Sequence, residues 1–291
     1  MRQELVRATE LLQRDDSNSI EEALRLIQST VFSFSVKVCG HREDAEDTMQ
    51  DVLFKSVPYL KKIESPQALA VWLYKVTRNR CWMSRRKSKF APERTLSLDE
   101  LMPDSAELQS LTLRDSSSPE SEAISQQQQE RVREAVLLIP SKYRLILVLH
   151  DMEDLDTSEV AKITGLSEGN VRVRLHRARL FLRRQLSSPA QNVIPKLKRK
   201  SAKPIDCRKM FAGLSEFIDG RVDDLSCQHM QKHLRECPPC TAFVEDLNRA
   251  VQRCKSYEVN CQSTTADKVR KLLMHEYLRL SELAGPSAAR V

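Results

Sequence analysis

Glycine and aromatic residues are scarce in this chain, with six glycines among 291 residues and an aromatic content of 5%. Charged residues, in contrast, make up 30% of the sequence. Segments in which apolar residues recur at helical spacing appear from the N-terminal region to the C-terminal region. This composition is typical of a helical protein with short turns, so we predict an all-α fold.

Long apolar runs are also missing. No segment approaches the length needed to cross a bilayer, and the N-terminus MRQELVRATE lacks the apolar core of a signal peptide. We therefore expect a cytoplasmic protein that does not contact membranes. In that compartment its eight cysteines should bind metal, respond to oxidants or lie buried, rather than form structural disulfides. Cys39 and Cys81 have apolar helical surroundings and are expected in the core.

The chain is basic, with a net charge of +7 and a pI near 9.0, which suits a polyanionic partner. Two segments have the composition of flexible linkers: residues 91–127 are rich in Ser, Pro, Asp and Glu, and residues 188–205 combine prolines with a basic cluster. They separate three predicted domains and a final helix or tail, at residues 18–90, 128–187, 206–255 and 256–291.

Residues 137–186 have the pattern of a helix-turn-helix. Ile139 and Pro140 start one helix, because proline is tolerated at the first helical position. Asp156 and Glu159 have the spacing of a capping box that opens the next helix. Gly165 fits a left-handed turn, and Ser167 can cap a third helix. The third helix then lies where a recognition helix enters the major groove of DNA.

The predicted recognition helix has two different faces. Its apolar residues recur at helical spacing and should face the core: Val171, Leu175, Ala178 and Leu182. Its other face and flanks carry mainly arginine, which suits DNA phosphates: Asn170, Arg172, Arg174, Arg177, Arg179, Arg183 and Arg184. Asn170, Val173 and Arg177 point most directly away from the core and can read bases. The alternative is a solvated basic face on a helical hairpin. The helix caps and the charge asymmetry argue against this alternative.

A helix that starts near Arg42 has an acidic face opposite an apolar stripe. The acidic residues are Glu43, Asp44, Glu46, Asp47 and Asp51, and the stripe contains Ala45, Met49, Val52, Leu53 and Val57. An acidic face would repel DNA, so we expect it to contact a protein; a solvated face is the alternative.

The next predicted helix, residues 68–89, combines aromatic residues with positive charge. Trp72, Leu73 and Val76 are expected in the core, whereas Tyr74, Lys75, Arg78 and Asn79 are expected on other faces. Basic residues interleaved with aromatic ones are typical of proteins that bind single-stranded DNA. Tyr74 and Asn79 are the better candidates for reading a base.

These motifs in this order resemble the extracytoplasmic-function group of bacterial RNA polymerase sigma factors. The motifs are D-x-x-Q-D from Asp47, W-L-Y-K-V-x-R-N from Trp72, L-x-I-P-x-x-Y-R from Leu137 and E-V-A-x-x-x-G-L-S-E-G from Glu159, which continues as V-x-x-R-L-H-R-A-R. The resemblance covers residues 18–90 and 128–187. It implies a sigma factor that binds core RNA polymerase and promoter DNA, and that is not an enzyme.

The resemblance also implies site residues. Polymerase binding is assigned to Asp47, Gln50, Asp51, Leu53 and Phe54. Binding of the melted −10 element is assigned to Tyr74, Lys75, Arg78, Asn79, Arg85 and Arg86, with help from the loop Ile63–Gln67. Recognition of the −35 duplex is assigned to Ser167, Asn170, Arg172, Val173, Arg174, Arg177 and Arg179. Asn170 stands where the family usually has threonine, so the preferred −35 sequence is open.

The C-terminal region contains a candidate zinc site, C-x25-H-x3-C-x2-C, formed by Cys207, His233, Cys237 and Cys240. His233 and Cys237 are one helical turn apart, and the Cys-Pro-Pro-Cys turn can bring Cys240 to the same point. Three thiolates and one imidazole complete a tetrahedral site for one zinc ion, which suits a structural role. Cys227 and His229 are rival ligands, and cysteines without a metal are the alternative. The pattern resembles a zinc-binding anti-sigma domain, which is normally a separate protein.

Several functional readings remain beside the leading one of a sigma factor regulated in cis. A helix-turn-helix regulator would bind duplex DNA without joining polymerase, and a zinc- or redox-sensing adaptor would act mainly by binding proteins. The resemblance suggests inhibition by the chain's own zinc region, or binding of a separate anti-sigma factor. The physics allows such inhibition, because a zinc region docked on the stripe of residues 45–57 would compete directly with polymerase. Oxidation of its zinc-bound thiolates could release it; a constitutive structural zinc site is the alternative.

Overall fold

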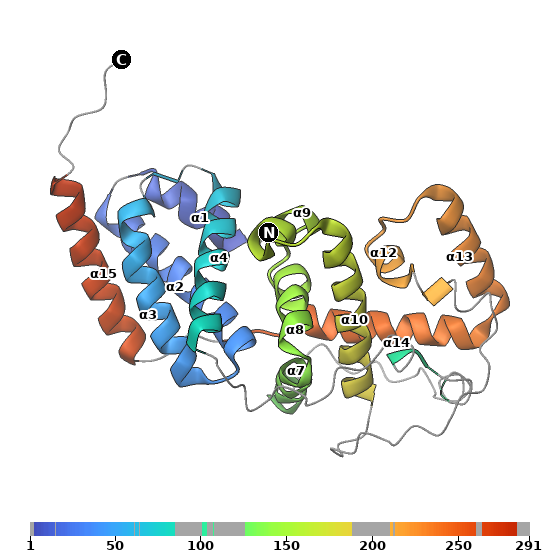
Figure 1. Cartoon of the computed structure of the whole chain (residues 1–291). Helices are drawn as coiled ribbons and strands as arrows, with labels where there is room; N and C mark the ends of the chain where they lie inside the picture. Colours follow the sequence, from blue (N-terminus) through green and yellow to red (C-terminus); the bar gives the residue numbers. More distant parts are fainter. Residues whose placement is uncertain are drawn as a thin grey trace. The chain divides into compact units, whose positions relative to one another are not determined.

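The computed structural model describes residues 3–14, 16–60, 62–63, 65–84, 101–103, 107, 126–187, 210–211, 213–259 and 264–283. Over these residues every regular element is a helix, which confirms the predicted all-α class (Figure 1). Contacts divide the chain into two compact units. The first unit comprises Met1–Lys89, Val148–Leu166 and Glu258–Val291, and the second comprises Phe90–Leu147 and Ser167–Tyr257.

The first unit is built around one long helix. This central helix, α2 (Ser17–Cys39), packs against α1 (Gln3–Leu12), α3 (Arg42–Leu60) and α4 (Pro66–Ser84). Asp16 caps its start by accepting a hydrogen bond from the Ser19 amide, and Gly40 ends it in a left-handed conformation with φ of 86°. Most side chains of α2 are buried, as expected of a helix with neighbours on several sides.

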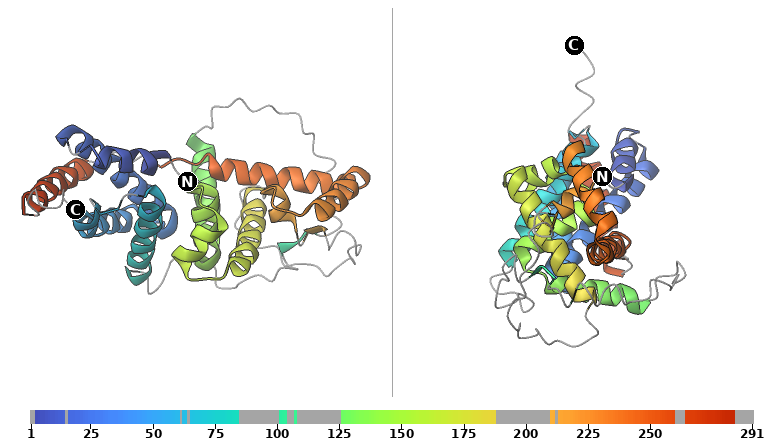
Figure 2. Two further views of the ribbon diagram at one scale, coloured as in Figure 1. Left: turned by 90° about the horizontal axis from the view of Figure 1, so that it is seen from above. Right: turned by 90° about the vertical axis from the view of Figure 1, so that its right-hand side faces the viewer.

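Two segments distant in sequence complete the first unit. Residues 148–166 contribute a π-helical turn, η1 (Val148–Met152), which packs against α2, and α9 (Thr157–Thr164), which packs against α4. The C-terminal helix α15 (Thr264–Leu283) runs beside α2 and α3 (Figure 2). Its residues Val269, Leu273 and Tyr277 are buried there. The apolar side of the C-terminal helix therefore packs on the N-terminal helical domain.

The second unit is built around the predicted recognition helix. That helix, α10 (Glu168–Ser187), packs against α7 (Gln126–Leu138), α8 (Ser141–Leu147), α12 (Leu214–Ile218) and α14 (Pro238–Lys255). A further helix, α13 (Asp224–Glu236), packs against α14. The Tyr143 and Phe181 rings stack with centroids 5.9 Å apart, and Phe211 meets Phe243 edge-on at 5.0 Å. The region predicted to bind zinc therefore shares a core with α10.

The local signals read from the sequence are present at their predicted positions. Asp156 and Glu159 form a reciprocal capping box at the start of α9, and Gly165 ends this helix with φ of 72°. Ser167 accepts a hydrogen bond from the Asn170 amide at the start of α10. The four apolar residues predicted for the inner face of α10 are all buried: Val171, Leu175, Ala178 and Leu182.

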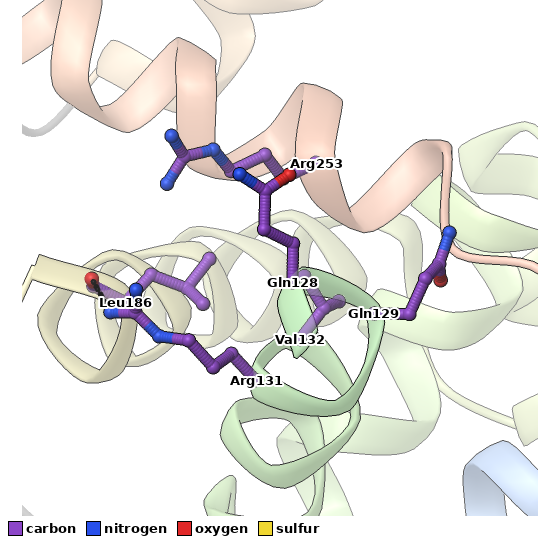
Figure 3. A pocket seen from close by; sticks show the side chains of 6 residues that line it. All are labelled: Gln128, Gln129, Arg131, Val132, Leu186 and Arg253. Atoms are coloured by element: carbon purple, nitrogen blue, oxygen red, sulfur yellow. Dashed lines mark hydrogen bonds between the residues drawn. The ribbon is translucent and has the colours of Figure 1, made fainter. Parts of the chain in front are cut away.

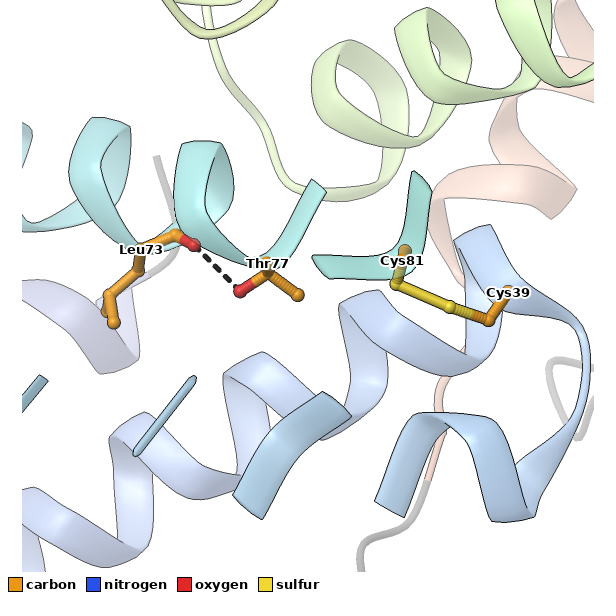
Figure 4. The surroundings of a disulfide bond; sticks show 4 residues. All are labelled: Cys39, Leu73, Thr77 and Cys81. Atoms are coloured by element: carbon orange, nitrogen blue, oxygen red, sulfur yellow. Dashed lines mark hydrogen bonds between the residues drawn. A yellow bond between two sulfur atoms is a disulfide. The ribbon is translucent and has the colours of Figure 1, made fainter. Parts of the chain in front are cut away.

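Cys39 and Cys81 lie in the core, as predicted, but they are also joined by a disulfide that links α2 to α4 (Figure 4). The expectation of no structural disulfide is therefore wrong for this pair. Their positions on separate elements, 42 residues apart, come together only when α2 packs against α4. Among the residues that the structure describes, no helix combines the length and the apolar character of a membrane span.

Candidate functional site

The acidic face of α3 is the candidate polymerase contact, and most of its assigned residues are accessible. Asp47 is exposed, Gln50 and Asp51 are half-buried, and the Phe54 side chain is 42% exposed although it is large and apolar. Asp51 pairs with Arg80 of α4, which fixes its position without burying it. Leu53 has no exposed surface. Its assignment as a direct contact is therefore corrected, because it faces the core that supports the acidic face.

The apolar stripe of α3 is not open for docking. Ala45, Met49, Val52, Leu53 and Val57 are all buried in the core of the first unit. The helix packs there against α2, α4 and α15. The hypothesis that the zinc region docks on this stripe is therefore wrong, because the stripe is already covered within the unit.

Of the four candidate strand-binding residues of α4 that the structure describes, two are exposed and two bind other parts of the chain. Lys75 and Asn79 are exposed. Arg78 is half-buried and donates a hydrogen bond to the carbonyl of Ile163, at the end of α9. Tyr74 is only 2% exposed, and its hydroxyl donates to Glu153. The prediction that Tyr74 lies on an open face is wrong, because residues 148–166 cover this side of α4.

Other residues assigned to the −10 element are only partly described. Arg85 and Arg86 lie outside the described residues, as do two positions near the Ile63–Gln67 loop. The sequence reading missed Tyr59, which is 50% exposed at the end of α3 and meets the Trp72 ring at 5.6 Å. Trp72 itself is half-buried rather than a core residue. The two rings are tilted by 47°, and the exposed Tyr59 ring offers a flat face on which an unstacked base can lie.

The first turns of α10 present the candidate −35 surface. Ser167, Asn170 and Arg172 are exposed, and the Val173 side chain is 54% exposed. Arg174 and Arg177 are half-buried. The Arg177 guanidinium donates to the Tyr143 hydroxyl at 3.0 Å, which orients this arginine. Burial raises the pKa of Tyr143, but the hydrogen bond and charge of Arg177, together with Lys142, outweigh it and leave this pKa below its usual value.

Two arginines further along α10 are not available to DNA. Arg179 is fully buried and holds Asp219 in a bidentate pair at 2.7 and 3.1 Å. Arg183 is 1% exposed, pairs with Asp246 at 3.0 Å and with Glu107, and lies over the Phe243 ring. The assignments of Arg179 to the −35 element and of Arg183 to phosphates are corrected, because α12, α14 and their carboxylates cover this part of α10.

His176 lies in the same covered region. Its Nδ1 is 3.0 Å from the Ser215 hydroxyl of α12. Burial, with the charges of Arg179 and Arg177, lowers the pKa of His176 to about 4, so the ring is neutral near pH 7. Arg172 on the adjoining turn pairs with Glu216 of α12 at 3.4 Å. Four polar residues of α10, spaced three or four positions apart, are thus matched by groups from the C-terminal region: Arg172, His176, Arg179 and Arg183.

Three of the four predicted zinc ligands come together. The ligand atoms of His233, Cys237 and Cys240 lie within 4.8 Å of one another. His233 is in the last turn of α13, Cys237 lies between the helices, and Cys240 is buried in the first turn of α14. Soft thiolates and an imidazole at such short separation fit zinc. Cys207 lies outside the described residues, and the rivals Cys227 and His229 are not part of this group.

A small groove opens where α7, the end of α10 and α14 meet (Figure 3). Its lining consists of Gln128, Gln129, Arg131, Val132, Leu186 and Arg253. Arg131 donates to the Leu186 carbonyl at 3.5 Å, so one wall of the groove is tied to the end of α10. The lining combines amide and guanidinium side chains with the apolar side chains of Val132 and Leu186.

Comparison with known protein families matches three segments of the chain. The family "Sigma-70 region 2" matches residues 22–90, and "Sigma-70, region 4" matches residues 129–182. The family described as "Putative zinc-finger" matches residues 214–241. The region 2 match contains α3 and α4, the region 4 match contains α9 and most of α10, and the zinc-finger match contains His233, Cys237 and Cys240.

Three individual relatives each match between 50% and 60% of this chain. The chain is 23% identical to the ECF RNA polymerase sigma factor SigW of Bacillus subtilis, over 60% of this chain and 92% of SigW. It is 24% identical to the RNA polymerase sigma factor YlaC of the same organism, over 58% of this chain and 93% of YlaC. It is 27% identical to the ECF RNA polymerase sigma factor SigM of Mycobacterium tuberculosis, over 50% of this chain and 65% of SigM.

The open acidic face of α3, the basic start of α10 and the matches to both sigma-70 regions agree, and they indicate a non-catalytic transcription initiation factor. The helix-turn-helix regulator that acts without polymerase is not favoured, because it accounts for region 4 but not for region 2. The chain therefore belongs to the extracytoplasmic-function sigma factors, which direct transcription initiation, and carries a zinc-finger region fused to its sigma regions.

Proposed function

We propose that this sigma factor binds core RNA polymerase through the open side of α3 and contacts promoter DNA through α4 and α10. Asp47, Gln50, Asp51 and Phe54 form the polymerase contact. Lys75 and Asn79 contact the melted −10 element, with Tyr74 and Arg78 once they are uncovered. Asn170, Val173 and Arg177 read the −35 duplex. The exposure of Asp47, Phe54, Lys75, Asn79, Asn170 and Val173 supports their assignments.

We further propose that the fused zinc region inhibits the chain in cis. The observation that carries this proposal is the capture of Arg179 and Arg183 by Asp219 and Asp246. A phosphate and a carboxylate compete for the same guanidinium fork, so arginines held in these pairs cannot contact a DNA backbone. α12 and α14 also lie against the side of α10 that carries them. Docking thus withdraws part of the positive surface of α10.

Zinc supports the docked state from within the zinc region. His233, Cys237 and Cys240 would hold the ion, with Cys207 as the proposed fourth ligand. The ion has a structural role there, because it ties α13 to the start of α14. α14 also carries Asp246 and Phe243, which contact Arg183 of α10. Zinc that holds the start of α14 in place therefore also stabilises the packing of α14 on α10.

Run-off transcription with purified core polymerase tests both proposals. Full-length protein is compared with a chain that ends at Leu186 and with the double variant Asp219→Asn and Asp246→Asn. The asparagine at position 219 removes the negative charge that pairs with buried Arg179, at a cost on the order of 3–5 kcal/mol for a broken buried pair. We expect more transcript from both altered chains than from the parent.

A matched control is Asp224→Asn with Glu245→Gln. These two acids lie on α13 and α14 and are exposed, so the charge change is the same without loss of an interface pair. This control should transcribe like the parent. Equal activity of all four proteins would refute inhibition in cis, and absence of any transcript on promoters of related sigma factors would count against the assigned DNA contacts.

A further inference from the structure

Three polar side chains from separate elements meet inside the first unit. The Lys37 ammonium of α2 lies 3.0 Å from one carboxylate oxygen of Glu153, and the Tyr74 hydroxyl of α4 donates to the other oxygen at 2.6 Å. The Lys37 and Glu153 side chains have no exposed surface. Tyr74 also packs edge-on against Phe34, with ring centroids 4.8 Å apart. We call these three residues the Lys37–Tyr74–Glu153 cluster.

The cluster holds a distant segment of chain in one position. Glu153 follows η1 and precedes α9, and it lies 116 residues from Lys37 and 79 from Tyr74. A buried charge is tolerated only where a partner of opposite charge and further hydrogen bonds meet it. Residues 148–166 therefore cannot slide along α2 and α4 without separating a buried ion pair. The position of this segment is set by charge as well as by apolar packing.

A second contact fastens the other end of the same segment. Arg78 donates to the carbonyl of Ile163, in the last turn of α9. Carbonyls in a last helical turn lack partners within the helix and carry partial negative charge, so a guanidinium satisfies them well. α9 packs along α4 between the two contacts. Tyr74 and Arg78 are thus bound by the chain itself, whereas Lys75 and Asn79 on the same helix are exposed.

We infer that Val148–Leu166 is an intramolecular partner of the strand-binding side of α4, and that it must leave before Tyr74 and Arg78 can contact single-stranded DNA. This inference rests on the proposed role of α4. The segment presents the kind of groups that a nucleic acid backbone presents: a carboxylate meets Lys37 and Tyr74, and a carbonyl oxygen meets Arg78. Only open molecules can bind a strand. The apparent affinity is therefore the affinity of the open form multiplied by the fraction of molecules that are open.

Hydrogen–deuterium exchange on the full-length chain tests the docking directly, in parent and Glu153→Gln. The glutamine keeps an acceptor for the Tyr74 hydroxyl but leaves the Lys37 charge without its carboxylate. We expect faster exchange in residues 148–166 and 73–78, with unchanged exchange in α12, α13 and α14. The matched control is Asp154→Asn, which removes the same charge one residue away, where the side chain is exposed. Asparagine tolerates the left-handed backbone at this position, where φ is 55°.

Competition with DNA is measured by fluorescence anisotropy, with a labelled single strand of mixed sequence and its duplex as the control probe. Glu153→Gln should bind the single strand about tenfold more tightly than the parent, as expected when a mostly closed population opens. Asp154→Asn should bind like the parent. If Glu153→Gln does not fold, Tyr74→Phe is used in the exchange experiment, because it removes only the hydroxyl contact, and it should speed exchange in residues 148–166.

The outcomes separate this inference from the sigma assignment. Parent-like exchange in residues 148–166 of the folded variant would overturn the docking role of Glu153, whatever the run-off assay shows. Faster exchange with unchanged strand binding would overturn the competition with DNA. Faster exchange with tighter binding of the single strand, but not of the duplex, supports the inference.

Discussion

Arginines on α10 differ in function because they differ in what surrounds them. Arg177 lies on the accessible part of the helix and is oriented by Tyr143, whereas Arg179, two residues later, is buried against Asp219. Two residues correspond to about 200° around a helix, so the pair faces nearly opposite sides. A count of positive charges along the helix does not separate a base-reading arginine from one that holds a neighbouring helix.

The first prediction concerns base reading by the start of α10. In holoenzyme, Arg177→Ala or Asn170→Ala should change which −35 bases are preferred, at about 1–3 kcal/mol for each lost base contact. The measurement is binding to a set of promoter duplexes with single substitutions in the −35 element. Arg184→Ala serves as the control and should weaken binding to all sequences alike and reduce its salt dependence. Uniform loss in all three variants would contradict direct readout.

The second prediction concerns pH. His176 titrates at about 4 in the folded chain because of burial and the charges of Arg179 and Arg177, against a usual value of 6.5. As pH falls, His176 therefore gains its proton at a higher pH in the unfolded state than in the folded state. The resulting stability is fully present above pH 6.5 and is lost progressively between pH 6.5 and 4, by about 3 kcal/mol.

Thermal unfolding of parent and His176→Gln over this pH range isolates the effect. The charged groups near this histidine, including Arg179, Asp219 and Glu216, are present in both proteins, so the difference between the two curves reports His176. The variant should lose less stability than the parent between pH 6.5 and 4. Parallel curves would show that His176 does not contribute.

At the scale of elements, α3 combines a buried side with an open acidic side. The buried side is held by α2, α4 and α15, so the open side can be changed without removing core packing. This separation is what makes a surface helix suitable as a rigid contact for a large partner. α15 adds to it, because it packs against both α2 and α3 and buries Val269 and Leu273.

The third prediction concerns polymerase binding by α3. The triple variant Asp47→Ala, Gln50→Ala and Asp51→Ala should abolish binding to core polymerase and leave the helical circular dichroism unchanged. Glu46→Ala is the control within the acidic face, because Glu46 is half-buried, pairs with Arg42 of the same helix and is not among the assigned contact residues. Pull-down or anisotropy with core polymerase measures the effect. Retained binding of the triple variant, with normal helicity, would refute the assignment.

At the scale of the whole molecule, the boundaries of the family-matched regions do not coincide with those of the compact units. The region 4 match covers residues 129–182, but residues 148–166 belong to the unit built on region 2. The zinc-finger region shares a unit with α10. Each of these associations covers groups that the proposed function assigns to DNA. The chain thus combines promoter-binding elements with intramolecular partners for them.

The fourth prediction concerns zinc. Cys237→Ser together with Cys240→Ser should remove bound zinc, loosen α12 to α14 and raise run-off transcription above that of the parent, because Arg179 and Arg183 are released. Zinc content is measured by a chelating dye and transcription with core polymerase. Cys227→Ser is the control and should keep zinc and parent activity, because Cys227 lies outside the ligand group. Equal or lower activity of the double variant would leave zinc as a structural element that does not inhibit.

The sequence by itself determined the features that depend on near neighbours in the chain. The caps at Asp156 and Gly165, the inner face of α10 and the spacing of His233, Cys237 and Cys240 follow from helical geometry, which repeats every few residues. The motifs of the two sigma regions are likewise continuous segments, so they were identified without the fold.

Only the tertiary structure decided which polar residues are accessible. Tyr74 and Arg179 fall on positions that a single helix would expose, yet Glu153 and Asp219, 79 and 40 residues away, cover them. The disulfide between Cys39 and Cys81 depends in the same way on how α2 packs against α4. The periodicity of one helix shows which side chains share a face, but burial depends on the element that packs against that face, and distant segments of the chain supply it.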